Sequence, residues 1–301
     1  KGDPASRPVD LSREERDATV ALAVRHGLAP LLHRALQSSG EWRHWPDHLT
    51  RLLDEERQAT ALANLQRYGE FRRITRVLGD LGIPVLALKG LHLAERAYGD
   101  ISLRPMSDMD ILVPRNRIRE AIGALYGIGY GFDEELSAAS DEVLENRYDV
   151  ELLHRENGLL LEVHWTIDEL NSGDPEWLDE LWRDALPERL GDVDTWVFPA
   201  EFLLLHVCAH LARKHLFDFS LRGLCDIAAI VQRHPGFDWA GFIARCRRHG
   251  LTRHVALALR LASDHLGVSV PREVLVELDV DELDSGIVAL AMQQLSGAGH
   301  S

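Results

Sequence analysis

The chain has 301 residues, 46% of them hydrophobic, and carries a formal net charge of −15. This length accommodates roughly two or three compact units, and the hydrophobic fraction supports a real core. Because nucleic-acid affinity rests largely on Lys and Arg side chains that neutralise phosphates, the acidic balance argues against a broad nucleic-acid surface and for a small substrate, with a local basic groove for RNA as an open alternative.

The first third of the chain is predicted to be helical. Apolar residues recur at spacings of three and four over 11–37 and again over 48–81, with Arg, Glu and Gln between them. This is the pattern of amphipathic helices. A Gly-Ile-Pro sequence at 82–84 breaks it, so we assign residues 1–82 to an N-terminal helical segment.

A small α/β core is predicted to follow, over 83–198. Residues 85–88 are expected to form a buried strand that ends at Lys89-Gly90, and helices are expected over 91–98 and 117–126. Lys89 is notable because the chain has only two other lysines among its 33 basic residues. A lysine in this apolar setting suits a functional charge, and the alternative is a side chain that snorkels from a strand end to solvent.

Two carboxylates separated by one apolar residue open the next apolar run, 107–113. In a strand, alternate side chains share a face, so Asp108 and Asp110 project together while Met109 and Ile111 pack behind them. Two like charges on one face repel each other unless a cation lies between them, and carboxylate oxygens suit Mg²⁺ or Mn²⁺. The pair therefore predicts a metal site, with a solvated strand edge as the alternative.

A third carboxylate lies in a second strand pattern, 159–165, where Glu162 and His164 share one face. An Asn-Gly dipeptide just before it favours a two-residue type I′ turn, so residues 150–154 are expected to pair antiparallel with this strand. One sheet would then carry all three acids. The same register would place Glu151 opposite His164, which is an ordinary cross-strand alternative to a role for His164 in orienting Glu162 or contacting substrate.

The rest of the chain is predicted to be helical after one more short strand at 194–198. The expected helices cover 200–214, 221–233, 239–249, 252–266 and 280–295. We assign residues 199–301 to a C-terminal helical domain. The predicted fold class is therefore α+β, a small mixed-sheet core flanked by an N-terminal helical segment and a C-terminal helical bundle.

Two pairs of polar residues lie four positions apart on these helices. His206 and His210 have a spacing that suits zinc, but no Glu or third ligand completes a metalloprotease motif, so contacts within the core or between helices are favoured. Arg222 and Asp226 are expected to form a helix-surface or interdomain ion pair.

Neither the cysteines nor the first residues indicate an exported protein. Cys208, Cys225 and Cys246 have spacings that suit neither a CxxC metal site nor a disulfide framework, so we expect them to be small buried hydrophobic residues. Residues 1–8 lack an apolar signal core, and no run approaches the ~20 apolar residues that span a bilayer. We expect a cytoplasmic protein without a membrane partner.

Roughly residues 80–230 resemble the nucleotidyltransferase superfamily typified by DNA polymerase beta, and within it a bacterial group of uncharacterised nucleotidyltransferases. The resemblance rests on the order and spacing of Leu88-Lys89-Gly90, Tyr98-Gly99-Asp100, Arg104, 107–113, Gly129-Tyr130 and 161–165, and more weakly on 203–210 and 221–227. It implies transfer of a nucleoside monophosphate from an NTP co-substrate to an acceptor, with Mg²⁺ or Mn²⁺ as cofactor.

The resemblance also implies roles for individual residues. Asp108 and Asp110 would hold the metals that bind the triphosphate, and Glu162 would complete the acceptor side or take a proton from the acceptor hydroxyl.

The nucleotide-binding set is expected to be Lys89, Gly90, Arg104 and Ser107. Most superfamily members have Gly-Gly or Gly-Ser where this chain has Lys89-Gly90; Gly90 keeps the close backbone approach, and Lys89 and Arg104 would supply charge to the phosphates. An ion pair between Arg104 and Asp100 or Asp108 is the structural alternative.

The leading functional prediction is a metal-dependent nucleotidyltransferase whose acceptor is a hydroxyl or phosphate of a small molecule or peptide. One alternative is a toxin or modifying enzyme that adds nucleotides to tRNA or protein, and another is a catalytically degenerate nucleotide-binding protein. Asp-x-Asp motifs also occur in glycosyltransferases and haloacid-type phosphatases. The short α/β portion argues against the first, and acids that precede rather than follow the apolar run argue against the second.

Overall fold

A mixed sheet forms the centre of the protein in our computed structural model, which describes residues 11–132, 147–167, 174–213, 217 and 221–296. Seven strands in the described residues are arranged in the order β3-β4-β5-β2-β1-β7-β6. Their bounds are β1 Leu86–Ala87, β2 Asp108–Leu112, β3 Tyr130–Gly131, β4 Asp149–His154, β5 Leu160–His164, β6 Leu186–Leu190 and β7 Val193–Val197. β2 is parallel to β5 and β1 is parallel to β7, while the other neighbours are antiparallel. The α+β class is confirmed.

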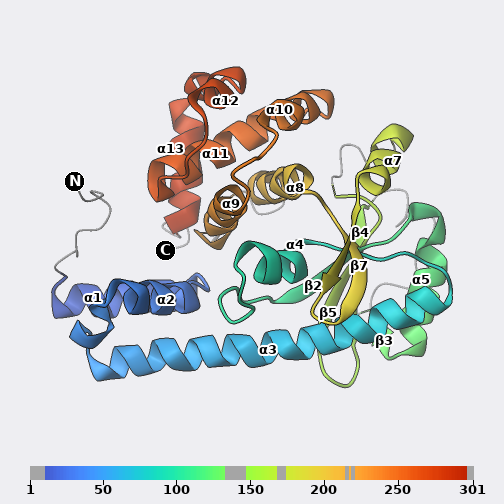
Figure 1. Ribbon diagram of the computed structural model, residues 1–301, viewed down its shortest axis with the longest axis horizontal. Helices are drawn as coiled ribbons and strands as arrows, with labels where there is room; N and C mark the ends of the chain where they lie inside the picture. The colour runs from blue at the N-terminus through green and yellow to red at the C-terminus, as the bar shows by residue number, and fades with distance from the viewer. Residues whose placement is uncertain (1–10, 133–146, 168–173, 214–216, 218–220, 297–301) are drawn as a thin grey trace.

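The N-terminal helices lie along one side of the molecule (Figure 1). They are α1 (Arg13–Arg25), α2 (Ala29–Ser39), a 3₁₀ turn η2 (Glu41–His44) and α3 (Asp47–Asp80). The helical pattern predicted over 11–37 is divided into the two helices α1 and α2, because Gly27 adopts φ 66°, a left-handed conformation that ends α1 and that glycine accepts at little cost. The prediction over 48–81 is confirmed by the 34-residue helix α3.

The two faces of the sheet pack against different helices. Met109 and Ile111 point toward α3 and α5 (Ile118–Gly127), where they join one apolar core with Phe71 of α3. Leu86 and Leu112 belong to a second core that the sheet shares with the C-terminal helices. Strand alternation therefore separates a largely apolar face, which also carries His154 and Thr195, from a face that carries both apolar residues and the predicted acids.

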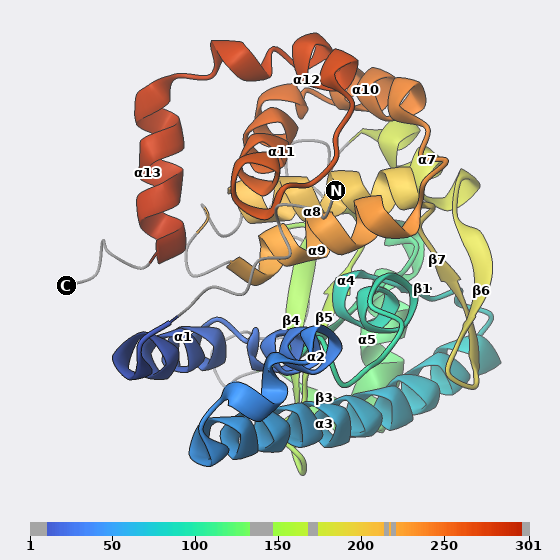
Figure 2. The ribbon, with the colours of Figure 1, turned by 60° about the vertical axis from the view of Figure 1, so that its left-hand side comes forward.

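The helices from α7 onward lie on the side of this second face, with α8 and α9 next to the sheet and α12 and α13 farther from it (Figures 1 and 2). They are α7 (Pro175–Arg183), α8 (Ala200–Arg213), α9 (Leu221–Arg233), α10 (Trp239–Arg248), α11 (Thr252–Leu266), α12 (Arg272–Glu277) and α13 (Ser285–Ser296). The helix expected over 280–295 is shorter, because a left-handed residue, Asp279, and the 3₁₀ turn η5 (Val280–Glu282) precede α13. Within the described ranges, no helix is both long enough and apolar enough to cross a bilayer.

The hairpin between β4 and β5 differs from the expected one by two residues. Its loop has four residues, 155–158, since the His154 amide donates to the Leu159 carbonyl at 2.9 Å. The register consequently pairs Asp149 with His164 and Glu151 with Glu162, so the prediction that Glu151 lies opposite His164 is wrong. A shift of two leaves every side chain on its expected face.

Candidate active site

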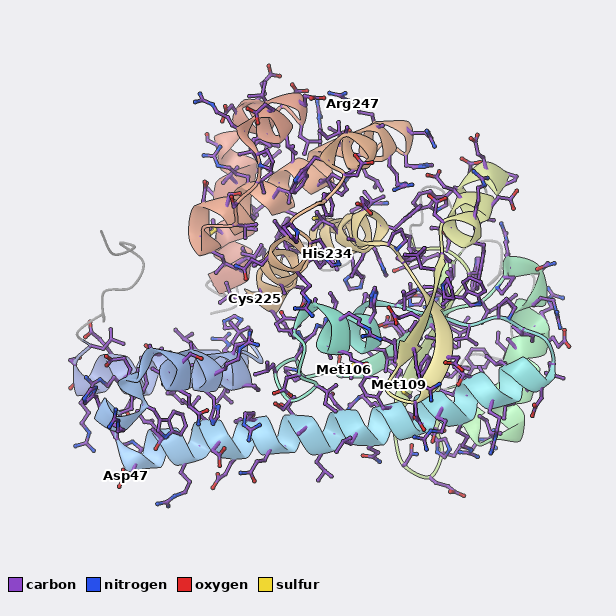
Figure 3. All side chains as sticks on the ribbon, viewed as in Figure 1. Asp47, Met106, Met109, Cys225, His234 and Arg247 are labelled. Carbon is purple, nitrogen blue, oxygen red and sulfur yellow. The ribbon has the colours of Figure 1, made fainter. Side chains whose placement is uncertain are left out.

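Paired strands bring the predicted acids to one place on the second face of the sheet. Asp110 of β2 lies beside Glu162 of β5 in the parallel register. Asp108 precedes Asp110 by two positions on the same strand, and all three carboxylates line one cavity. Met109, between the two aspartates, is fully buried on the opposite face (Figure 3). The sequence therefore predicted the common face correctly.

Lys89 lies among these carboxylates. Its ammonium Nζ is 2.5 Å from Asp110 Oδ1 and 3.8 Å from Glu162 Oε2, and it is 3.0 Å from His210 Nε2 of α8. The residue is only 8% exposed, so the snorkelling alternative is wrong. We refer to Asp108, Asp110, Glu162, Lys89 and His164 as the sheet cluster.

The turn that carries Lys89 has an unusual backbone. Lys89 adopts φ 32°, a left-handed conformation that costs energy for any residue except glycine. It begins the short helix α4 (Lys89–His92), which continues as the π-helical turn η3 (Leu93–Ala97) in place of the regular helix expected over 91–98. At Gly90 a Cβ would lie 2.7 Å from the Met106 sulfur, so any larger residue would require the Met106 side chain to move. The turn thus places a lysine where glycine would be relaxed.

His164 lies within hydrogen-bonding distance of two carboxylates of the sheet cluster. Its Nε2 is 3.2 Å from both Asp110 Oδ1 and Glu162 Oε2, and its Nδ1 is 3.9 Å from Asp149 Oδ2. Burial alone would lower the pKa of His164, but the hydrogen bonds to the two carboxylates raise it above its ordinary value. His164 therefore orients Asp110 and Glu162, and its ring is only 1% exposed.

The carboxylates of the sheet cluster differ electrostatically. Burial would raise the pKa of Asp110 and of Glu162, but Lys89 and His164 hold both values below the ordinary range. For Asp108, burial and the negative charge of Asp110 raise the pKa, and Lys89 offsets only part of this effect. The cluster thus contains three acids against one lysine and one histidine with a raised pKa, and the negative charge of Asp108 is the least compensated.

A cavity of about 130 Å³ opens beside the sheet cluster. Its walls come from the sheet, from the turn after β1, from the loop before β2 and from α8 and α9. The predicted nucleotide-binding residues Lys89, Gly90, Arg104 and Ser107 all line it. His210 and Arg222 line it from the helical side.

Arg104 makes a different ion pair from the one expected. Its Nε and Nη2 donate to the two Asp226 oxygens of α9 at 2.9 and 2.8 Å, and the Tyr98 hydroxyl donates to the same carboxylate at 2.8 Å. The alternatives of Asp100 or Asp108 as partner are therefore wrong, and so is the Arg222–Asp226 pair. Although burial opposes its charge, the carboxylate of Asp226 raises the pKa of Arg104. This buried fork joins the loop before β2 to the C-terminal helices.

The donor set suits a metal ion. Ligand atoms of Asp110, Glu162 and His164 all lie within 4.8 Å of one another, and the three side chains are buried. The two carboxylates match Mg²⁺ or Mn²⁺, and the imidazole would be a further ligand only with an unprotonated Nε2. Asp108 stands outside this tight group but lines the same cavity. In the described part of the chain, His206 and His210 do not belong to such a group, and their rings contact each other edge to face.

Residues 12–267 match the family described as uncharacterised nucleotidyltransferase. The chain belongs to this family. Its structure is similar to the solution structure of the antibiotic-resistance factor ANT(2'')-Ia, with a TM-score of 0.45 and 14% sequence identity over 65% of this chain and 97% of that chain. No curated protein matches the sequence. The family agrees with the one that the sequence motifs predicted, and the protein is a nucleotidyltransferase.

Residues outside the predicted set also build this candidate site. His210 contacts Lys89, Asp226 holds Arg104, and Asp149 lies behind His164. The sequence singled out the first two only as members of helical i, i+4 pairs. For Asp149 the available signal was strand alternation, which puts it on the same face as Glu151.

Proposed function

We propose that this nucleotidyltransferase moves a nucleoside monophosphate from an NTP to a hydroxyl or phosphate of a small-molecule or peptide acceptor, with Mg²⁺ or Mn²⁺ as cofactor. The observation that carries the proposal is the side-by-side register of Asp110 and Glu162, with Lys89 within 4 Å of both at one cavity. The paired acids give the site an affinity for cations, and the lysine gives it a charge for phosphate.

Asp108, Asp110 and Glu162 would hold the metal, with His164 orienting the last two. The bound metal would supply positive charge that stabilises the entering and leaving oxygens of an in-line displacement. In that displacement the acceptor oxygen bonds to the α-phosphorus, the bond to the bridging oxygen breaks, and pyrophosphate leaves. Gly90 leaves room for close approach of the phosphates, and Lys89 offers them an ammonium.

Glu162 suits a cation better than it suits a proton. Despite its burial, hydrogen bonding to His164 lowers the pKa of Glu162, which makes its carboxylate a weaker base. We therefore assign Glu162 chiefly to cation binding. The proton of an acceptor hydroxyl would then leave to solvent or to the departing phosphates.

The test measures NTP binding and transfer separately. The full chain is titrated with each NTP in the presence of Mg²⁺, Mn²⁺ or EDTA, and is then incubated with panels of small molecules, peptides and tRNA. Mass spectrometry detects an added nucleotide, and pyrophosphate release gives the rate. Which panel is modified separates the small-molecule or peptide acceptor from the tRNA alternative.

Asp110→Asn is the decisive variant. We expect transfer to fall by roughly 10³-fold or more, because a ligand that neutralises developing charge is worth several kcal/mol in the transition state. Asp80→Asn, an exposed position at the end of α3, is the matched control and should retain full activity. Undiminished transfer by the Asp110→Asn protein would remove the mechanism, and failure of the wild type to bind any NTP would remove the function.

A further inference from the structure

A second arginine faces the cavity from the C-terminal helices. Arg222 lies in the first turn of α9, and its side chain is half-buried. Its Nη1 donates to the Pro105 carbonyl at 3.2 Å and lies 3.3 Å from the position of a Cβ at Gly27. The guanidinium is therefore held at the loop that leads into β2, beside the nucleotide site.

Arg222 lacks the acidic partner that helical spacing suggests for it. Asp226, four residues on, is occupied by Arg104 and by the Tyr98 hydroxyl. In the described ranges Arg222 forms no ion pair, and one carbonyl satisfies only part of its donor capacity. Burial and the nearby charge of Arg104 lower its pKa by more than Asp226 and Asp108 raise it.

A partly desolvated guanidinium without a carboxylate is costly to the folded protein. Its planar fork matches phosphate oxygens, and an anion bound in the cavity would offset that cost. Arg104 cannot fill the same role equally well, because both its Nε and its Nη2 are committed to Asp226. Arg222 is thus the more available guanidinium at this cavity.

Among the acids of the sheet cluster, Arg222 is associated with the end at Asp108. Of the three acids in the sheet cluster, its electrostatic neighbour is Asp108, whereas Lys89 lies between Asp110 and Glu162. Under the proposed function the acceptor side lies at Glu162, so the far end of the cavity receives the leaving group. We propose that Arg222 binds the terminal phosphates of the NTP, the part that departs as pyrophosphate. This inference rests on the proposed function.

Inorganic tripolyphosphate is the probe that isolates this contact. Calorimetric titrations of the full chain with tripolyphosphate, an NTP and the matching NMP would compare wild type with Arg222→Gln. We expect tripolyphosphate and NTP affinity to fall about tenfold or more, because the substitution removes a charge-assisted hydrogen bond to the phosphates. NMP affinity should change by less than about twofold, since the NMP lacks the terminal phosphates. Arg233→Gln, an exposed arginine at the other end of α9, is the matched control.

The possible results distinguish failure of this inference from failure of the proposed function. Wild-type protein that binds neither NTP nor tripolyphosphate would overturn both. Wild-type protein that binds them, with Arg222→Gln binding equally well, would overturn the inference alone and leave Arg222 as a structural link between α9 and Pro105. If Arg222→Gln does not fold, Arg222→Lys carries the test, because it keeps the charge but loses the fork. Its tripolyphosphate affinity should then fall several-fold, and an unchanged affinity would likewise overturn the inference.

Discussion

Two clusters in this protein, each built around a buried carboxylate, combine carboxylates, basic groups and a histidine, but they differ in charge balance. In the sheet cluster, three carboxylates share one lysine at the edge of a cavity. In the second cluster, which we call the α7–α10 cluster, Glu180 and Asp184 meet two arginines and a histidine. Its members are Glu180, Asp184, Arg245, Arg248 and His249.

The two clusters differ in how completely their carboxylate charges are paired with basic groups. Glu180 accepts from Arg245 Nε at 2.9 Å and from His249 Nε2 at 2.9 Å, so its charge is matched within the protein. In the sheet cluster the repulsion between Asp108 and Asp110 is only partly offset by Lys89. A matched cluster holds elements together, whereas an acid excess beside a cavity leaves a site for a further cation.

Removal of one acid from the sheet cluster should give the largest effect. In Asp108→Asn we expect transfer to fall roughly 10³-fold, because a metal ligand is lost, while the free energy of unfolding stays equal or rises by up to about 1 kcal/mol. The sign follows from the raised pKa of Asp108: its charged form is disfavoured in the folded state, so removing the charge relieves the fold. Urea denaturation and a transfer assay measure the two changes. A clearly destabilised variant would show that the acid excess carries no cost.

The opposite outcome is expected in the α7–α10 cluster. Glu180→Gln should lower the free energy of unfolding by about 3 kcal/mol, because it leaves buried donors of Arg245 and His249 without their anion. Transfer activity should stay at the wild-type level. Asp184→Asn serves as the control, since that more exposed partner should cost only about 0.2–1 kcal/mol. Equal effects of the two substitutions in urea denaturation would argue against a special role for Glu180.

The contribution of Glu180 should also depend on pH. Burial opposes its charge, but Arg245 and His249 bring the folded-state pKa of Glu180 below its ordinary value of 4.5. A lowered acid pKa stabilises the fold at pH values above 4.5, and the stabilisation is lost as the pH falls through the folded-state value. The difference in unfolding free energy between wild type and Glu180→Gln should therefore be largest near neutral pH and shrink below pH 4.5. Denaturation series at several pH values would reveal a constant difference if this linkage is absent.

Local sequence patterns predicted the elements that have a clear period. The strands of the site and the helices α9 and α11 have alternating or helical apolar patterns, and the structure contains them within about a residue or two of the expected bounds. The strands β3 and β6 were missed, because β3 has two residues and β6 contains Pro187 on a largely exposed edge strand. For α7, the Asp174 cap and Pro175 at its first position were signals that could have revealed it.

The acids of the sheet cluster could be predicted from local sequence patterns, whereas their contacts with the C-terminal helices could not. Asp108, Asp110 and Glu162 share a face through strand alternation, which is a local property. The Lys89–His210 and Arg104–Asp226 contacts join residues 121 and 122 positions apart, and they depend on how α8 and α9 pack over the sheet. The spacing of residues within one helix or strand does not encode that packing. The i, i+4 spacing of Arg222 and Asp226 therefore led to the wrong prediction of an ion pair between them.

The smallest expected effect tests why a lysine occupies the left-handed position after β1. Lys89→Gly and Lys89→Ala both remove the ammonium from Asp110 and Glu162, so the loss of charge cancels when the two variants are compared. At φ 32° glycine avoids the Cβ strain that alanine retains, and we expect the glycine variant to be more stable to urea by about 1 kcal/mol. Both variants should lose NTP affinity. If alanine is as stable as glycine, the backbone at residue 89 is unstrained. A glycine variant that is more stable than the alanine variant, with NTP binding lost in both, would mean that Lys89 is kept for its charge although its backbone conformation favours glycine. That result would distinguish the sheet cluster further from the α7–α10 cluster, in which the charges are paired within the protein.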